Sequence, residues 1–267
     1  MTSPEHRYTS LFIDLDNTLW DTIHDNKKCL EELFVDYQFD RHFASFEAFY
    51  ALYLPYNERL WERYQNQEID RRTLLQERML HVLRPMGIRD TRLAMRLNRD
   101  LNERTTRHTT LIPGATELLE HVSRSYRLFV LSNGFHEVQS LKMERAGIAR
   151  FFRGLILSER VGARKPNPVF FDYALHHTRT RRTEVLMIGD SYAADIAGAL
   201  RSGIDAQDFE VESKPDLSPV TTAEYFAGRE GVAPRPLHSA LDLSKIEAAG
   251  FTPGDSMERL ESYVRAL

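Results

Sequence analysis

Four groups of polar residues suited to catalysis lie at expected strand or loop ends of this 267-residue chain: Asp14 with Asp16, Ser132 with Asn133, Lys165, and Asp190 with Asp195. The first pair follows the apolar run 8–13, which predicts a short buried strand. Side chains alternate along a strand, so both carboxylates would face the same way and repel unless a cation or a shared proton intervenes. A capping aspartate followed by a turn aspartate would give the same pattern without chemistry.

Each of the other groups also has a structural explanation. Ser132 and Asn133 could simply cap a helix. Lys165 could be a solvated loop lysine, Asp190 a turn residue and Asp195 a surface position on a helix. All four groups, however, lie at the ends of elements that one sheet would bring together. Such a coincidence favours a common site.

The elements that position these groups alternate between strand and helix from residue 111 onward. Apolar segments predict strands over 126–131, 154–157 and 185–188, separated by helices near 114–123, 134–146 and 169–177. This alternation indicates an α/β fold with a doubly wound parallel sheet. Ligands of such sheets bind beyond the carboxyl ends of the strands, where the four polar groups lie.

The segment between the first strand and residue 109 has helical periodicity throughout and predicts a separate, all-helical, lid-like insert. Residues 59–107 hold twelve arginines and seven acidic residues, an excess of five positive charges. These arginines either cover solvated helix faces or provide a field that attracts an anionic substrate.

Composition places the chain among ordinary globular proteins, with 42% hydrophobic and 28% charged residues. The net charge of −4 argues against a nucleic-acid polymer as partner. Cys29 is the single cysteine, so no internal disulfide forms. A polar start without a signal-peptide core, and no apolar run of membrane-spanning length, predict a cytoplasmic protein without a membrane partner. The sequence indicates no oligomeric state.

The polar groups together resemble the four motifs of the haloacid dehalogenase superfamily. These are matched by Asp14-x-Asp16-x-Thr18, by Ser132, by Lys165, and by Gly189-Asp190-Ser191 through Asp195. The resemblance implies a Rossmann-like core with a helical cap inserted after the first motif. We expect the core in residues 1–20 and 109–212, the cap in 21–108, and an acidic C-terminal extension in 213–267.

The resemblance also implies roles for the site residues. Asp14 would attack phosphorus and form an aspartyl-phosphate, and Asp16 would act as general acid and then general base. Mg²⁺ would be held by Asp14, the main-chain carbonyl of Asp16, and Asp190. Phosphate would bind Ser132, Asn133 and Lys165, with Thr18 and Asp195 orienting these groups.

The acid at position 16 favours phosphoryl transfer over dehalogenation, since halide leaves without a proton. A phosphonatase would need a Schiff-base lysine from the cap, where only Lys27 and Lys28 occur, near its start.

Three stretches resemble pyrimidine nucleoside 5′-monophosphatases: residues 60–69, 132–139 and 161–175. This resemblance implies a small phosphomonoester substrate such as dUMP, dTMP or UMP. Trp61 and Phe135 are candidates to stack on a base or, alternatively, aromatics that pack cap against core, and His136 is a further candidate contact. A phosphatase for phosphoglycolate or a sugar phosphate is the alternative enzyme. A binding protein without turnover is the alternative from another class.

Residues 205–267 hold twelve acidic and six basic residues, and 219–245 resemble the end of dTDP-4-dehydrorhamnose reductases. The chain has no glycine-rich dinucleotide loop and no Tyr-x-x-x-Lys pair, so reductase activity is not implied. The tail either packs on the core and supplies a last strand near 208–211, or forms an appendage that binds a partner.

Overall fold

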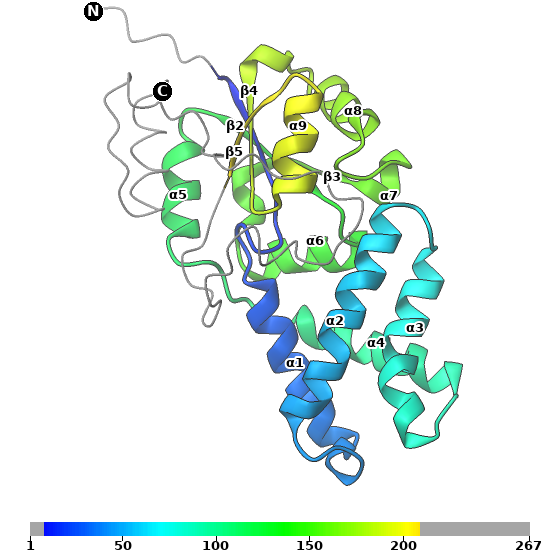
Figure 1. Ribbon diagram of the computed structural model, residues 1–267. Coiled ribbons are helices and arrows are strands. Elements are labelled where there is room, and N and C mark those ends of the chain that lie inside the picture. The colour runs from blue at the N-terminus through cyan, green and yellow to red at the C-terminus, as the bar shows by residue number, and fades with distance from the viewer. Residues whose placement is uncertain (1–7, 209–267) are drawn as a thin grey trace, which may run out of the picture. The chain divides into compact units, whose positions relative to one another are not determined.

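A computed structural model describes residues 8–208, which form a parallel five-stranded sheet with helices around it and an all-helical cap (Figure 1). The strand order is β3-β2-β1-β4-β5. The strands are β1 (Ser10–Ile13), β2 (Arg127–Ser132), β3 (Phe152–Leu157), β4 (Val185–Gly189) and β5 (Asp205–Asp208). The predicted fold class is therefore confirmed.

The central strand β1 pairs in parallel with β2 and β4, and all four of its residues are buried. Burial on both faces explains why the strands are continuous apolar runs rather than alternating patterns. One face packs against Phe170 and Phe171 of α8 (Pro168–Thr178) and Ala199 of α9 (Ala197–Arg201). Helix α5 (Ala115–Val122) lies on the opposite side of the sheet from α9 (Figure 1).

The remaining core helices are α6 (His136–Arg145), which connects β2 to β3, and the short α7 (Ser158–Val161). The structure places β5 at Asp205–Asp208, ahead of the predicted range 208–211. The rest of that range and the whole of 213–267 lie outside the described residues. The two interpretations of the tail and its resemblance to a reductase stay predictions.

The cap consists of four helices between β1 and α5: α1 (Thr22–Asp36), α2 (Phe46–Gln65), α3 (Arg71–Leu83) and α4 (Thr91–Thr105). Each begins after a side chain that accepts a hydrogen bond from the first turn, a strong helix-start signal. These N-cap residues are Asp21, Ser45, Asp70 and Asp90. Single 3₁₀ turns occur at Phe39–Arg41, Arg84–Met86, Ala149–Phe151 and Arg182–Glu184. The predicted domain boundaries stay predictions.

Two chain segments join cap and core, and they run side by side. The amide of Asp21 donates to the carbonyl of Thr110 over 3.0 Å, and the amide of Ile112 donates to the carbonyl of Leu19 over 2.9 Å. Within residues 8–208, no helix is both long and apolar enough to span a bilayer. The cytoplasmic location stays a prediction.

The cap has its own apolar core, centred on Phe49, which is 1% exposed. Its ring lies 5.6 Å from that of Phe34 and 5.4 Å from that of Phe39, measured between centroids. The cap is thus held together by aromatic packing that does not involve the sheet.

We expect Phe49→Ala to lower the free energy of unfolding by about 3–5 kcal/mol, because a large cavity replaces a buried ring. Thermal melts followed by circular dichroism measure this change. Val35→Ala is the matched control, because Val35 is 66% exposed on the same cap. Equal melting temperatures for the two variants would contradict a cap held by this cluster.

Candidate active site

The site is built around the ammonium group of Lys165, which is 2% exposed. Its Nζ donates to Asp14 Oδ1 over 2.5 Å, to Asp195 Oδ1 over 2.6 Å and to the carbonyl of Leu131 over 2.7 Å. These three acceptors use all three N–H bonds of the ammonium group. Burial alone would lower the pKa of Lys165, but the charges of Asp14 and Asp195 raise it above its usual value. Lys165 is therefore a fixed positive charge.

Asn133 positions the loop that carries Lys165. Its side-chain amide donates to the carbonyl of Lys165, and its side-chain oxygen accepts from the amide of Lys165, both over 2.9 Å. The sequence predicted a phosphate contact for Asn133. In the structure, its side-chain amide group links the end of β2 to the loop that carries Lys165. The residue also lines the cavity described below.

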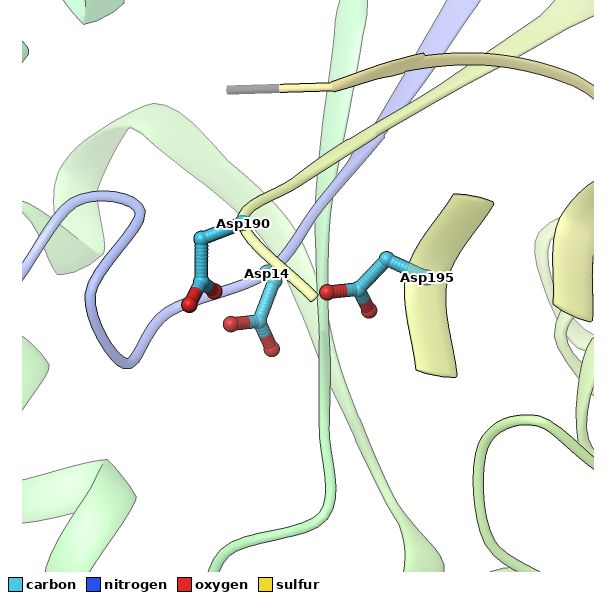
Figure 2. A group of neighbouring side chains, drawn as sticks. All are labelled: Asp14, Asp190 and Asp195. Atoms are coloured by element: carbon cyan, nitrogen blue, oxygen red, sulfur yellow. The ribbon is translucent and has the colours of Figure 1, made fainter. Parts of the chain in front are cut away.

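Three carboxylates face one another beside Lys165, with one oxygen of each within 4.8 Å of the others: Asp14, Asp190 and Asp195. Figure 2 shows Asp14 between the other two, with Asp195 extending toward it from the helical segment. Asp14 and Asp190 follow adjacent strands, β1 and β4. Thr18 fixes Asp190, because its hydroxyl lies 3.2 Å from Asp190 Oδ1 and accepts from the Asp190 amide over 3.0 Å.

The negative charge of this cluster favours the binding of both protons and cations. Burial raises the pKa of Asp14 well above its usual value, against the opposing effect of Lys165. Burial and the charge of Asp195 raise the pKa of Asp190 to about 6. Lys165 is one positive charge beside three carboxylates, which leaves the cluster as a whole short of positive charge. An all-oxygen donor set suits a hard divalent cation such as Mg²⁺.

Asp195 lies in a π-helical turn, Tyr192–Ile196, and is 1% exposed, so it is not a surface position. Besides Lys165, it accepts a hydrogen bond from the amide of Ser191 over 3.2 Å. The turn approaches β4 so closely that a Cβ at Gly189 would collide with the Asp195 carboxylate. Glycine at the end of β4 therefore permits the contact between Asp195 and Lys165.

Asp16 lines the same cavity as Asp14. The strand ends at Ile13, so both aspartates lie in the following loop. Asp16 Oδ1 accepts from Lys142 Nζ over 2.7 Å and from the Thr22 hydroxyl over 2.5 Å. Its second oxygen accepts from the side-chain amide of Gln139.

Burial by itself would raise the pKa of Asp16, but the charge of Lys142 and the hydrogen bonds from Lys142, Thr22 and Gln139 hold it below its usual value. Asp16 is thus a carboxylate in this arrangement. Among the described residues, no hydrogen bond reaches its main-chain carbonyl, which is the atom expected to bind the metal.

Ser132 ends β2 with its hydroxyl facing the site and is 1% exposed. Its Oγ accepts from the amide of Gly134 over 3.0 Å and from the Gln139 side chain over 2.8 Å. Both bonds use the oxygen as acceptor, so the hydroxyl proton is available to a ligand.

Sequence reasoning missed Gln139 and Lys142. They lie three residues apart on α6, hence on one helix face, directly after the Ser132 loop. That spacing was the available signal, but helical periodicity alone could not show that this face meets Asp16.

A cavity of about 400 Å³ connects these groups with the cap. Trp61 and Phe135 line it, with ring centroids 5.3 Å apart, whereas the exposed His136 is not among its lining residues. Phe135 is 4% exposed and also packs with Tyr64 of the cap, so it joins cap to core whether or not it contacts a ligand.

Two arginines strengthen the contact between cap and core around this cavity. Arg71, on the first turn of α3, pairs with Glu137 and Glu159, and its guanidinium carbon lies 4.1 Å from the centroid of Phe135. The guanidinium carbon of Arg164 lies 3.8 Å from the centroid of Tyr64. Cap and core are therefore joined here by charge and cation–π contacts.

Comparisons with known proteins agree with this geometry. The chain is 31% identical over 195 residues to the pyrimidine 5′-nucleotidase YjjG of Escherichia coli, covering 73% of this chain and 82% of YjjG. It is 27% identical over 202 residues to the pyrimidine 5′-nucleotidase PynA of Streptococcus pneumoniae, covering 74% of this chain and 82% of PynA.

Among solved structures, the magnesium-bound HAD-hydrolase YfnB of Bacillus subtilis superposes with a TM-score of 0.69 at 25% identity, covering 75% of this chain and 88% of YfnB. The family profile of haloacid dehalogenase-like hydrolases matches residues 11–207. This range includes every polar group described above, and the chain therefore belongs to the haloacid dehalogenase-like hydrolases.

Proposed function

We propose that this hydrolase is a Mg²⁺-dependent phosphatase that acts through an aspartyl-phosphate on Asp14. The observation that carries the proposal is the pairing of Asp14 with the buried Lys165 at the end of β1. Lys165 holds one carboxylate oxygen of Asp14, which leaves the other oxygen to attack phosphorus. Because Lys165 cannot lose its charge in this pairing, it also attracts the phosphate dianion.

In the first step, a carboxylate oxygen of Asp14 bonds to phosphorus as the bond from phosphorus to the ester oxygen breaks. The departing oxygen needs a proton, which Asp16 supplies. The Ser132 hydroxyl donates to a phosphoryl oxygen, and Lys165 balances the negative charge. The products of this step are the free alcohol and phosphorylated Asp14.

In the second step, a water molecule attacks phosphorus, and Asp16 accepts its proton as Asp14 is released. Lys142 favours this second role, because it holds Asp16 as a carboxylate. The first role needs protonated Asp16. The negative charge of a bound phosphate opposes the effect of Lys142 and favours that proton.

We assign to Mg²⁺ the carboxylates of Asp14 and Asp190 and the main-chain carbonyl of Asp16. Asp195 orients Lys165. When bound, Mg²⁺ supplies positive charge that offsets repulsion between the Asp14 carboxylate and the phosphate.

The proposed substrates are pyrimidine nucleoside monophosphates such as dUMP, dTMP and UMP. Two observations support this choice: YjjG and PynA are pyrimidine 5′-nucleotidases, and the cavity has aromatic walls at Trp61 and Phe135. Its volume of about 400 Å³ lies within the usual range for small-ligand sites, roughly 300–1,000 Å³.

We expect kcat/KM for dUMP and dTMP to exceed that for phosphoglycolate and hexose phosphates by at least about tenfold, which corresponds to roughly 1.4 kcal/mol of differential binding. Phosphate release from each compound, assayed with Mg²⁺, gives the comparison. Similar values throughout would contradict a nucleotidase and favour a phosphatase of broader or different preference.

Asp14→Asn is expected to lower turnover by at least about a thousandfold, because the amide cannot serve as the nucleophile. Acid quenching during turnover of a substrate with labelled phosphate should leave label on Asp14 in the native enzyme and none in the variant. Circular dichroism is the control for folding. A variant with native turnover would contradict the aspartyl-phosphate mechanism. If the native protein released no phosphate in the presence of Mg²⁺, a binding protein without turnover would be favoured.

Mg²⁺ is expected to raise the melting temperature by about 5–10 °C at a hundredfold excess over its dissociation constant, since it relieves carboxylate repulsion in the folded state alone. EDTA should reverse the rise, and Asp190→Asn should reduce it. Asp172→Asn is the matched control, since Asp172 is exposed on α8 and pairs with Arg182. A rise of the same size in Asp190→Asn and the native protein would contradict the assigned metal site.

A further inference from the structure

The cavity continues from the acidic cluster into the cap, where Arg78 of α3 forms part of its wall. Among the twelve arginines of residues 59–107, all of which the structure describes, Arg78 alone lines the cavity. It is 6% exposed. Its guanidinium group donates to two side-chain amide oxygens and also hydrogen-bonds to the Tyr53 side chain, and no carboxylate within residues 8–208 lies within 4.0 Å of it. A buried charge without a counter-charge is costly, so a role toward a ligand would explain its presence.

The guanidinium group is held in place by two asparagines of α4. Its Nε donates to the side-chain oxygen of Asn98, and a terminal nitrogen donates to that of Asn102 over 3.4 Å. Asn98 is 2% exposed, and its amide nitrogen donates to the carbonyls of Leu75 and Ala94. The orientation of Asn98 is therefore set by the helix backbones, and its oxygen must face Arg78. Arg78 is pre-organised before any ligand arrives.

Other donors surround Arg78 at this end of the cavity. Tyr53, Asn57 and Asn102 line the same wall, and the Tyr53 hydroxyl donates to the Asn57 side-chain oxygen over 3.4 Å. The amide nitrogens of Asn57 and Asn102 have no hydrogen-bond acceptor among the described residues. The cap end thus offers an excess of N–H donors, which suits a ligand with oxygen acceptors.

The chemistry of the walls distinguishes a neutral acceptor from a second anion. Tyr50, Leu54 and Leu101 give the cavity apolar and aromatic surfaces, which suit a planar ring. Glu58 also lines the cavity and would repel a carboxylate group, whereas it could accept from a ring N–H. A pyrimidine of the uracil or thymine type carries carbonyl oxygens on either side of such an N–H.

We propose that Arg78, held by Asn98 and Asn102, is the specificity-determining residue of the cap and donates to a carbonyl oxygen of a uracil- or thymine-type base. This assignment rests on the proposed nucleotidase function. It divides recognition between the ends of one cavity, with phosphate at Lys165 and the base at Arg78.

The test compares dUMP with 2-deoxyribose 5-phosphate, which has the same sugar phosphate and no base. The ratio of their kcat/KM values reports recognition of the base and cancels changes in the phosphate chemistry. Arg78→Met should lower this ratio by about 10- to 100-fold, since hydrogen bonds to charged groups are strong. Arg72→Met, at an exposed position on the same helix, should leave the ratio unchanged.

Arg78→Lys is the second variant, because it keeps the buried charge if the methionine variant fails to fold. Its single ammonium group cannot reproduce the guanidinium fork, so the ratio should again fall, by a smaller factor. The melting temperatures of all three variants show whether a fall in the ratio is accompanied by a loss of stability.

Three outcomes would overturn the assignment. A large ratio in the native enzyme that persists in both Arg78 variants would remove Arg78 from base recognition and leave the nucleotidase intact. A ratio near one in the native enzyme would overturn the nucleotidase proposal and the base subsite with it. A loss on phosphoglycolate that exceeds the loss on dUMP would show that Arg78 binds a carboxylate.

Discussion

The buried ammonium group of Lys165 is the interaction on which the rest of the site depends. It lies between Asp14 and Asp195, 2.5 and 2.6 Å from their nearest oxygens, and its third N–H bond goes to the backbone of β2. Removing the ammonium group would leave the buried carboxylates without their counter-charge, and breaking a buried pair in this way costs about 3–5 kcal/mol. The geometry of Asp14, the proposed nucleophile, is therefore coupled to a loop, a strand and a helical turn at once.

This coupling explains several features that have no obvious purpose alone. The Asn133 side chain bonds twice to the backbone of Lys165 and so fixes where the ammonium group enters the sheet. Gly189 leaves room for the Asp195 carboxylate. Thr18 holds Asp190 through hydrogen bonds to its carboxylate and its amide. The result is a rigid, electron-rich pocket with a deficit of positive charge, the condition that attracts a hard cation.

Core and cap contribute different chemistry to one cavity. The core supplies charged groups at strand ends, whereas the cap supplies aromatic walls and the amide-held Arg78. Cap and core also meet through Arg71 and Arg164, whose guanidinium groups lie over aromatic rings of the other part. Under the proposed function, reaction and recognition are carried by separate elements of the fold.

The sequence by itself determined the parallel α/β core, the helical insert and the residues Asp14, Ser132, Lys165 and Asp190. Apolar runs ending in polar groups specify strand ends, and parallel strand ends meet at one edge. Tertiary structure alone decided the contacts between elements distant in the chain: Lys142 and Gln139 with Asp16, Asn133 with Lys165, and Arg78 with the cavity. Helical periodicity shows which residues share a face but not what that face meets. For the same reason, the partners of Asp16 were not foreseen: the strand stops at Ile13, and Lys142 reaches the Asp16 carboxylate from a helix more than a hundred residues later.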